Sequence, residues 1–243
     1  MHLIKVNAID STNSFGREMF RENPQLPATC IVAKNQLSGR GQRGTVWTSQ
    51  PGENLTFSIV YPKPGISPDH QFLLSAAVAT CIVEALKQFD LPRLKVKWPN
   101  DIMSANRKIG GILIENVITE GKVAASVIGV GLNVNQRNFP GLPDAGSMYA
   151  VSGKKYDLEE VLERLLQELE KELSQLSNKR AAEILTHYKS HLFRMQVPST
   201  FQLPDNKLFT GMIADVSLSG KLLVRTEEEL LKEFDLKEVR LCF

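Results

Sequence analysis

The stretch at residues 36–47, QLSGRGQRGTVW, restricts the fold and chemistry of this chain more than any other. Three glycines and two arginines lie between Gly39 and Gly44, with no apolar residue among them. Glycine adopts positive φ angles easily and leaves its backbone N–H groups open to a ligand. Each arginine adds a permanent planar cation that suits phosphate or carboxylate. Because such a segment cannot hold itself in a core, we expect a mobile loop that binds an anion.

The same glycines match the pattern G-x-G-x-x-G, which occurs in several unrelated phosphate-binding loops. A dinucleotide-binding turn requires a helix after the third glycine, whereas a strand-like run follows here. A protein-kinase loop would be accompanied by D-F-G and H-R-D segments, and the chain contains neither. The pattern alone leaves a ligand-binding loop and a flexible surface loop equally open.

Composition limits the classes of protein to consider. The 243 residues suffice for one large domain, or for one domain with a small companion. A net charge of +2, without a dense block of lysine and arginine, gives no support for nucleic-acid binding. Three widely spaced cysteines indicate reduced thiols. The N-terminus lacks a signal-peptide pattern and no long uninterrupted apolar run is present, so we expect a cytoplasmic protein with no membrane partner.

Hydrophobic periodicity predicts a mixture of helices and strands. The expected strands cover 2–9, 29–33, 55–61 and 94–98, followed by a hairpin of 109–118 and 123–134 that turns at Glu120-Gly121. The expected helices begin after Ser11, at Pro68 and after Asp157, with another over 179–193. We interpret the glycine- and proline-rich passage 139–153 as surface loop.

Composition shifts near residue 194. Short strands over 197–203, 208–216, 221–225 and 239–242 are separated by turn signals, which is typical of a small β-barrel. We therefore expect a catalytic domain over 1–193 and a C-terminal barrel over 194–243.

Three further clusters combine small residues with polar ones. In Lys97-Trp-Pro-Asn-Asp101 an amide and a carboxylate follow a strand. They form either a site for hydrated Mg²⁺ near phosphates or a turn that is capped by its own side chains. In Lys108-Ile-Gly-Gly111 a cation precedes two glycines, which indicates close approach of a ligand or of another backbone. Residues 129–135, GVGLNVN, likewise combine glycines in an apolar strand with asparagines. Together these clusters favour a site for a nucleoside phosphate and a small acid, with charge stabilisation as the catalytic device.

His187 and His191 lie four residues apart, which is a spacing that two metal ligands on a helix can have. No third ligand lies nearby in the sequence, so we interpret them as helix-surface histidines.

The set of motifs resembles the biotin–protein ligases, in the short form that lacks an N-terminal DNA-binding domain. The resemblance runs from about residue 9 to the end, and the order and spacing of its motifs make it specific. The matching residues are Ser11-Thr12-Asn13, Gln36, the loop 39–44 with Trp47, Asn54-Leu55, Lys97–Asp101, Lys108-Ile-Gly-Gly-Ile-Leu and residues 129–135.

This resemblance implies an α+β fold: a mixed-sheet catalytic domain of the class II synthetase-like biotin ligase type, followed by a small Src-homology-3-like barrel. It implies an AMP-forming ligase that activates biotin with MgATP to biotinyl-5'-AMP and transfers biotin to a lysine of a biotin carboxyl carrier protein. A homodimer is one option for the assembly.

Site residues follow from the same resemblance. Lys108 and Arg40 would be catalytic, and Asp101 would lie near magnesium and phosphate. Biotin would be bound by Ser11, Thr12, Asn13, Gln36, Gly39, Arg40, Gly41, Lys108, Gly110 and Gly111. The nucleotide would be bound by Arg40, Gln42, Arg43, Trp47, Asn100, Lys108 and Asn133.

Two departures from the family pattern matter. Many members have arginine where this chain has Gln42, so we rank Gln42 below Arg40. Only ten residues precede Ser11, too few for a helix-turn-helix domain, and we expect no DNA partner.

Two other functions remain open. One is a lipoate or octanoate ligase or transferase, which would need an apolar tunnel in place of fixed partners for the ureido ring of biotin. The other is a non-catalytic biotin-binding module. Lys108, Asn100 and Asp101 argue against it, because a protein that only binds biotin needs no residues that bind phosphate.

Overall fold

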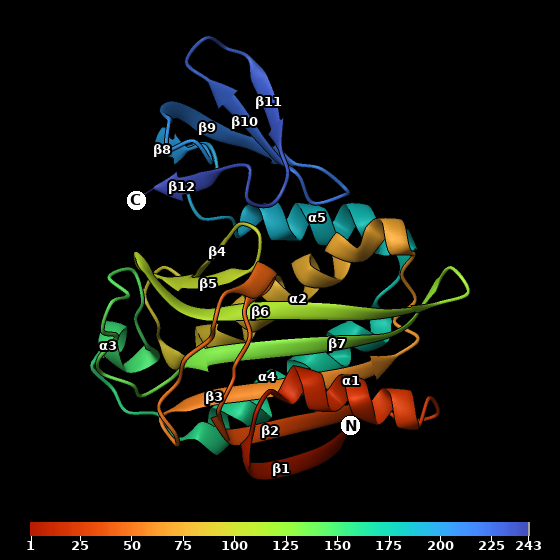
Figure 1. Cartoon of the computed structure of the whole chain (residues 1–243). Helices are drawn as coiled ribbons and strands as arrows, with labels where there is room; N and C mark the ends of the chain where they lie inside the picture. The colour runs from red at the N-terminus through yellow and green to blue at the C-terminus, as the bar shows by residue number, and fades with distance from the viewer. Residues whose placement is uncertain (243) are drawn as a thin grey trace.

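The computed structural model describes residues 1–242 of the chain, apart from the side chain of Arg43. Its larger unit is a seven-stranded mixed sheet in the order β1-β2-β3-β7-β6-β5-β4 (Figure 1). Only the β1–β2 pair is parallel. The strands are β1 (His2–Ile9), β2 (Thr29–Gln36), β3 (Asn54–Pro62), β4 (Lys95–Lys97), β5 (Asp101–Ser104), β6 (Arg107–Thr119) and β7 (Lys122–Asn133).

Helices cover both faces of this sheet. On one face α2 (Gln71–Leu86) packs between the sheet and two further helices, α4 (Leu158–Gln175) and α5 (Ala181–Ser190). On the other face α1 (Thr12–Glu22) closes a smaller core with Phe20, Ile31 and Val60. Strand alternation explains the two cores, because Cys30 and Ile59 face α2 while their neighbours Ile31 and Val60 face α1.

The segment Pro68–Phe89 is long and apolar enough to cross a membrane by length and composition alone. Of its most apolar window, 67% is buried inside the protein, against the sheet and its neighbouring helices. Its apolar character is therefore that of a central core helix. The segment is one α-helix flanked by single 3₁₀ turns at Pro68–His70 and Lys87–Phe89.

The C-terminal unit is a five-stranded antiparallel sheet in the order β11-β10-β9-β8-β12. Its strands are β8 (Ser199–Gln202), β9 (Leu208–Val216), β10 (Leu222–Thr226), β11 (Leu231–Phe234) and β12 (Arg240–Cys242). The two outer strands β11 and β12 do not pair with each other among the described residues, so closure into a barrel stays a prediction.

Specific contacts seat this sheet beside α5 and the edge of the larger sheet (Figure 1). The indole Nε1 of Trp98 donates to the carbonyl oxygen of Gly220 at 2.8 Å. The Lys189 ammonium lies 2.7 Å from Asp215. The predicted boundary after residue 193 follows the end of α5, although the division into domains remains a prediction.

The predicted α+β class is confirmed, and three elements were missed. The passage 139–153 is not entirely loop, because α3 (Met148–Ser152) forms there with Ser147 as its N-cap and Met148 fully buried. Strands β5 and β11 were also missed. All three are five residues or shorter, too short to display a period, and tertiary pairing determines them.

Candidate functional site

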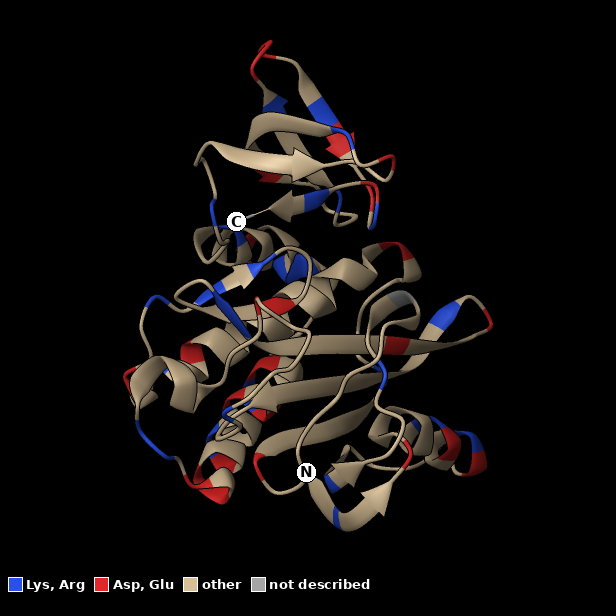
Figure 2. Ribbon diagram, turned by 60° about the vertical axis from the view of Figure 1, so that its left-hand side comes forward, with Lys and Arg blue, Asp and Glu red and all other residues tan. Residues whose placement is uncertain are grey.

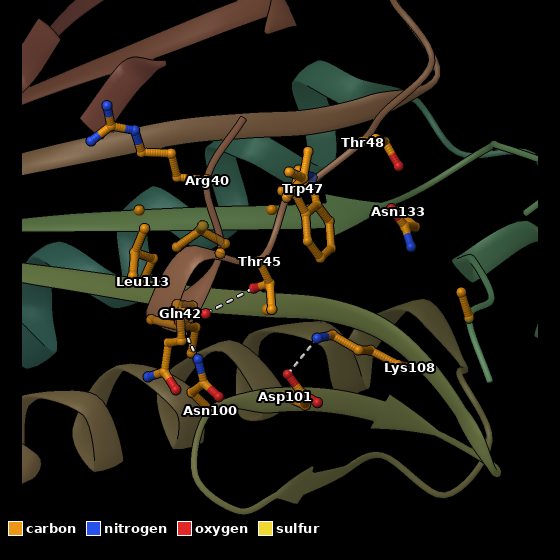
Figure 3. Close-up of a pocket in the computed structure, with 18 of the residues that line it drawn as sticks. Arg40, Gln42, Thr45, Trp47, Thr48, Asn100, Asp101, Lys108, Leu113 and Asn133 are labelled. Carbon is orange, nitrogen blue, oxygen red and sulfur yellow. Dashed lines mark hydrogen bonds and ion pairs between the residues drawn. The ribbon is translucent and has the colours of Figure 1, made fainter. Parts of the chain in front are cut away.

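A cavity of about 530 Å³ lies between the loop 40–48 and the sheet, and it collects most of the predicted site residues (Figure 3). Of these, its lining includes Ser11, Thr12, Asn13, Gln36, Arg40, Gly41, Gln42, Trp47, Asn100, Asp101, Lys108, Gly111 and Asn133. The predicted residues Gly39 and Gly110 do not line it, and both are buried. The predicted role of the Arg43 side chain lies outside the described part of the chain.

One end of the cavity is a fixed polar network at the start of α1. The Gln36 side-chain oxygen accepts hydrogen bonds from the Thr12 amide at 2.8 Å and from the Thr12 hydroxyl at 3.0 Å. The Ser58 hydroxyl lies 2.6 Å from both Thr12 Oγ1 and Asn13 Oδ1 and is fully buried. Because these bonds use the oxygen of Gln36, its Nε2 group is the part that can donate to a ligand.

Asn13 anchors the beginning of α1 to the sheet. Its Nδ2 donates to the Leu113 carbonyl at 3.2 Å and to the Glu115 carboxylate at 2.9 Å. A Cβ at Gly129 would lie 2.2 Å from Asn13 Oδ1, so only glycine leaves room for this amide. The polar start of α1 is thus held in place by protein contacts on several sides.

The glycine-arginine loop folds as a small hairpin. The Trp47 amide donates to the Gly39 carbonyl at 3.0 Å, and the Gly41 amide donates to the Thr45 carbonyl at 2.7 Å. Gly44 takes a φ of +83°, a conformation that favours glycine. Arg40 is exposed, and its guanidinium points away from Trp47 and Lys108 (Figure 3). Contact between Arg40 and a ligand beside Lys108 would therefore require the loop to move.

Trp47 lies on a platform of two paired glycines. Gly111 of β6 and Gly131 of β7 face each other in register. A Cβ at Gly131 would lie 2.3 Å from the indole, and one at Gly111 would lie 3.4 Å from it. The glycines therefore admit the aromatic ring at the sheet surface. The Trp47 Nε1 is buried without a hydrogen-bond partner in the described part of the molecule.

Lys108 and Asp101 form the charged centre of the cavity. Their side chains meet at 2.6 Å between Nζ and Oδ1, and both are partly exposed. The Lys108 ammonium also lies 5.8 Å from the centroid of the Trp47 ring. Lys97 pairs with Asp101 across β4 and β5, and burial lowers the pKa of the Lys97 ammonium despite the opposing effect of Asp101. A lysine beside one carboxylate can exchange that partner for an anionic ligand.

Two asparagines also line the cavity. Asn100 is buried and donates its Nδ2 to the Ile112 carbonyl. Asn133 donates its Nδ2 to the Gly146 carbonyl at 2.9 Å, while its buried Oδ1 has no partner among the described residues. A buried acceptor without a partner carries a desolvation cost that a ligand N–H or O–H donor would relieve.

Asp101 and Asp144 are the carboxylates of the described lining. Magnesium is commonly held by one or two carboxylates together with phosphate oxygens and water. Two carboxylates are too few to hold a magnesium ion by themselves. They fit a magnesium ion that is also bound by the phosphates of a nucleotide.

Among the residues at the site that sequence reasoning missed, three polar or charged ones stand out. Ser58 supports the polar network from the middle of a buried strand, where it resembles any packed serine. Asp144 lies in the passage interpreted as loop. Arg240 of β12 lines the cavity from the C-terminal sheet, and no local signal connects it to residues far earlier in the chain. Basic segments gather where the two sheets meet (Figure 2).

Comparison with known proteins identifies the family. Residues 6–133 match the biotin/lipoate A/B protein ligase family. The bifunctional ligase/repressor BirA of Bacillus spizizenii is 31% identical over 236 residues, covering 95% of this chain and 71% of that protein. The biotin–[acetyl-CoA-carboxylase] ligase of Paracoccus denitrificans is 28% identical over 230 residues, covering 89% of this chain and 91% of that protein.

The fold is also shared with a solved structure. The biotin protein ligase from Aquifex aeolicus in complex with biotin and ATP superimposes with a TM-score of 0.80 and 28% identity, covering 99% of this chain and 98% of that one. On the evidence of sequence and fold together, the chain belongs to the biotin/lipoate A/B protein ligase family.

Proposed function

We propose that this protein is a biotin–protein ligase, which activates biotin with MgATP and transfers it to a lysine of a biotin carboxyl carrier protein. The observation that carries this proposal is a single cavity that contains both the polar network of Thr12 and Gln36 and the Lys108–Asp101 pair. The first can hold an uncharged polar ring, and the second can hold the reacting anions. The similarity to ligases of biotin, one of them bound to biotin and ATP, supports the same function.

In the first step a carboxylate oxygen of biotin attacks the α-phosphorus of ATP. A new oxygen–phosphorus bond forms, the bond to the β-phosphate oxygen breaks, and pyrophosphate leaves. The two reactants are both anions, so the barrier contains a large electrostatic repulsion. The Lys108 ammonium lies where it can leave Asp101 and bind both reacting groups, and Arg40 adds a second cation when the loop moves over the site. Magnesium held by Asp101 and the phosphates would neutralise further charge.

In the second step the neutral ε-amine of the carrier lysine attacks the acyl carbon of biotinyl-5'-AMP. The carbon–nitrogen bond forms, the bond to the phosphate oxygen breaks, AMP leaves, and the amine loses a proton. Water would destroy the mixed anhydride before transfer, so the loop around Arg40 would have to exclude it. The hairpin contacts between Gly39 and Trp47 give this loop a defined shape from which to close.

The proposal assigns a role to each predicted site residue. The biotin site consists of Ser11, Thr12, Asn13 and Gln36, with Gly39, Arg40 and Gly41 of the loop and Lys108, Gly110 and Gly111 of β6 beside it. The nucleotide site consists of Arg40, Arg43, Trp47, Asn100, Lys108 and Asn133, with Gln42 as a weaker assignment. The same proposal includes a carrier protein as the partner of this protein and the cytoplasm as its location.

The decisive experiment is biotin-dependent exchange of labelled pyrophosphate into ATP by the purified protein. We expect exchange with biotin and none with lipoate or octanoate, because Thr12 and Gln36 present polar partners to a ring. Exchange with lipoate instead would indicate a lipoate ligase. Absence of exchange with every acid, together with retained biotin binding, would indicate a non-catalytic module.

A further inference from the structure

A cluster of metal-ligating side chains lies outside the cavity described above. Glu84 in the last turn of α2, His187 in α5 and His191 just beyond α5 place one ligand atom each within 4.8 Å of one another. None of the three lines the candidate active site. The fold therefore supplies, from a different helix, the third ligand that the sequence around the two histidines lacks.

The hydrogen bonds of His191 fix the orientation of its ring. Its Nδ1 lies 2.9 Å from the His187 carbonyl oxygen, which can only accept, so Nδ1 carries a hydrogen. Its Nε2 lies 2.7 Å from Glu84 Oε1. Nε2 is therefore the ring nitrogen that faces the Glu84 carboxylate and can bind a cation beside it. A histidine that binds a metal through one ring nitrogen usually donates a hydrogen bond from the other nitrogen, often to a backbone carbonyl.

The remaining geometry suits one small ion. His187 Nε2 lies 3.6 Å from the same Glu84 oxygen, and the two imidazole rings meet edge to face at 4.9 Å. Ligands about 2.0–2.2 Å from one zinc ion lie roughly 3–3.5 Å apart, so small side-chain adjustments suffice. His191 is mostly buried, whereas His187 is exposed, which leaves one side of the cluster open to a fourth ligand.

The surroundings define which ligands take part. Cys81 lies one turn before Glu84, but burial, aided by nearby glutamates, raises the pKa of its thiol to about 12, so it stays protonated. Lys87 binds the same Glu84 oxygen at 2.7 Å and competes with any cation there. Its side chain is well exposed, so it can move away into water.

From this geometry we propose that Glu84, His187 and His191 form a second cation site that binds a divalent transition-metal ion of the zinc class. Two imidazoles and one carboxylate prefer zinc, nickel or copper to magnesium or calcium, which require oxygen ligands. The bound ion would link α2 to the end of α5, where the His191 carbonyl accepts from the Val96 amide of β4 at 2.8 Å. It would thereby stabilise the segment after α5 that leads into the C-terminal sheet.

The test measures Zn²⁺ binding to the full-length protein by calorimetry, with Co²⁺ absorption as a second readout. We expect one ion per chain and no competition from Mg²⁺. His187→Gln should weaken Zn²⁺ binding by about 100-fold or more, since even loss of a supporting partner costs up to about that factor. His187 is exposed, so this variant should fold normally, which circular dichroism can check.

Two matched controls sharpen the test. His70→Gln removes a partly exposed histidine whose ring contacts the Asn178 side chain, and it should leave binding unchanged. Lys87→Ala should tighten binding because it removes the competing ammonium, whereas Lys154→Ala, which removes an exposed lysine paired with Asp90, should not. Equal Zn²⁺ affinity of the wild type and His187→Gln, or no binding by the wild type, would overturn the proposal.

Discussion

The Lys108 ammonium and the Asp101 carboxylate lie 2.6 Å apart, on neighbouring strands that line the candidate active site. Asp101 thus holds the Lys108 ammonium in place and partly neutralises its charge. An arriving anion must compete with this carboxylate for Lys108, and magnesium that binds Asp101 would release the lysine toward the phosphates. Under the proposed function, the pair would couple magnesium binding at Asp101 to the availability of Lys108 for the reacting anions.

Lys108→Ala should reduce the rate of adenylate formation by about 10²–10³-fold, the usual cost of removing one electrostatic partner of a transition state. Its stability should change little, because the lysine is partly exposed. Pyrophosphate exchange and urea denaturation measure the two effects. Lys108→Arg, which keeps the charge but changes its geometry, is the control. Near-normal exchange by Lys108→Ala would contradict the assigned role.

Arg40→Ala should increase escape of the intermediate more than it slows its formation. The guanidinium is exposed and directed away from Lys108, so its contribution depends on loop closure. Single-turnover assays without the carrier protein can compare biotinyl-5'-AMP retained on the protein with that released into solution. If release is as slow as in the wild type, the loop does not close over the intermediate through Arg40.

Gly131→Ala should weaken ATP binding by about tenfold or more and leave biotin binding nearly unchanged. The added methyl group would lie 2.3 Å from the indole of Trp47 and would displace the ring from the sheet. Gly111→Ala serves as a comparison, because its methyl group would lie 3.4 Å from the same ring and should displace it less. Calorimetric titration with each ligand measures both variants. Equal effects of the two substitutions would argue against a role for this platform.

Local sequence signals predicted a large part of the fold. The Asp157 side chain caps α4 as expected, accepting from the amides of Glu159 and Glu160. The β6–β7 hairpin turns at Glu120 and Gly121, and both residues have positive φ. Each feature depends on residues close together in the chain, so its cause can be read from the sequence.

The missing parts of the site are non-local. Arg240 reaches the cavity only because the C-terminal sheet folds back to the edge of the larger sheet. Glu84 joins His187 only because α2 packs against α5. Such juxtapositions depend on tertiary packing, which periodicity and turn signals do not describe.

Two tryptophan substitutions should have different effects on stability. Trp98→Phe removes a hydrogen bond to the buried Gly220 carbonyl, and we expect a loss of about 1–3 kcal/mol in the free energy of unfolding. Trp47→Phe removes an indole N–H that has no partner in the described residues, so it should cost less or even stabilise the apo-protein. Urea denaturation of both variants tests this. A larger loss in Trp47→Phe would show that its N–H is satisfied in solution.

The thiols of Cys30, which is buried, and Cys81, which is partly exposed, give a prediction about pH. Burial raises the pKa of the thiols of Cys30 and Cys81 from 9.0 to about 12. Because the folded state binds these protons more tightly than the unfolded state, the resulting stability is present below pH 9 and is lost as pH rises toward 12. Alkylation requires the thiolate, so at pH 8 both cysteines should react far more slowly in the native protein than in urea. Mass spectrometry after timed treatment with iodoacetamide measures this at each site. Equal rates in the native and unfolded protein would mean that the thiols are accessible and ionise normally, and that the packing of α2 against the sheet opens readily in solution.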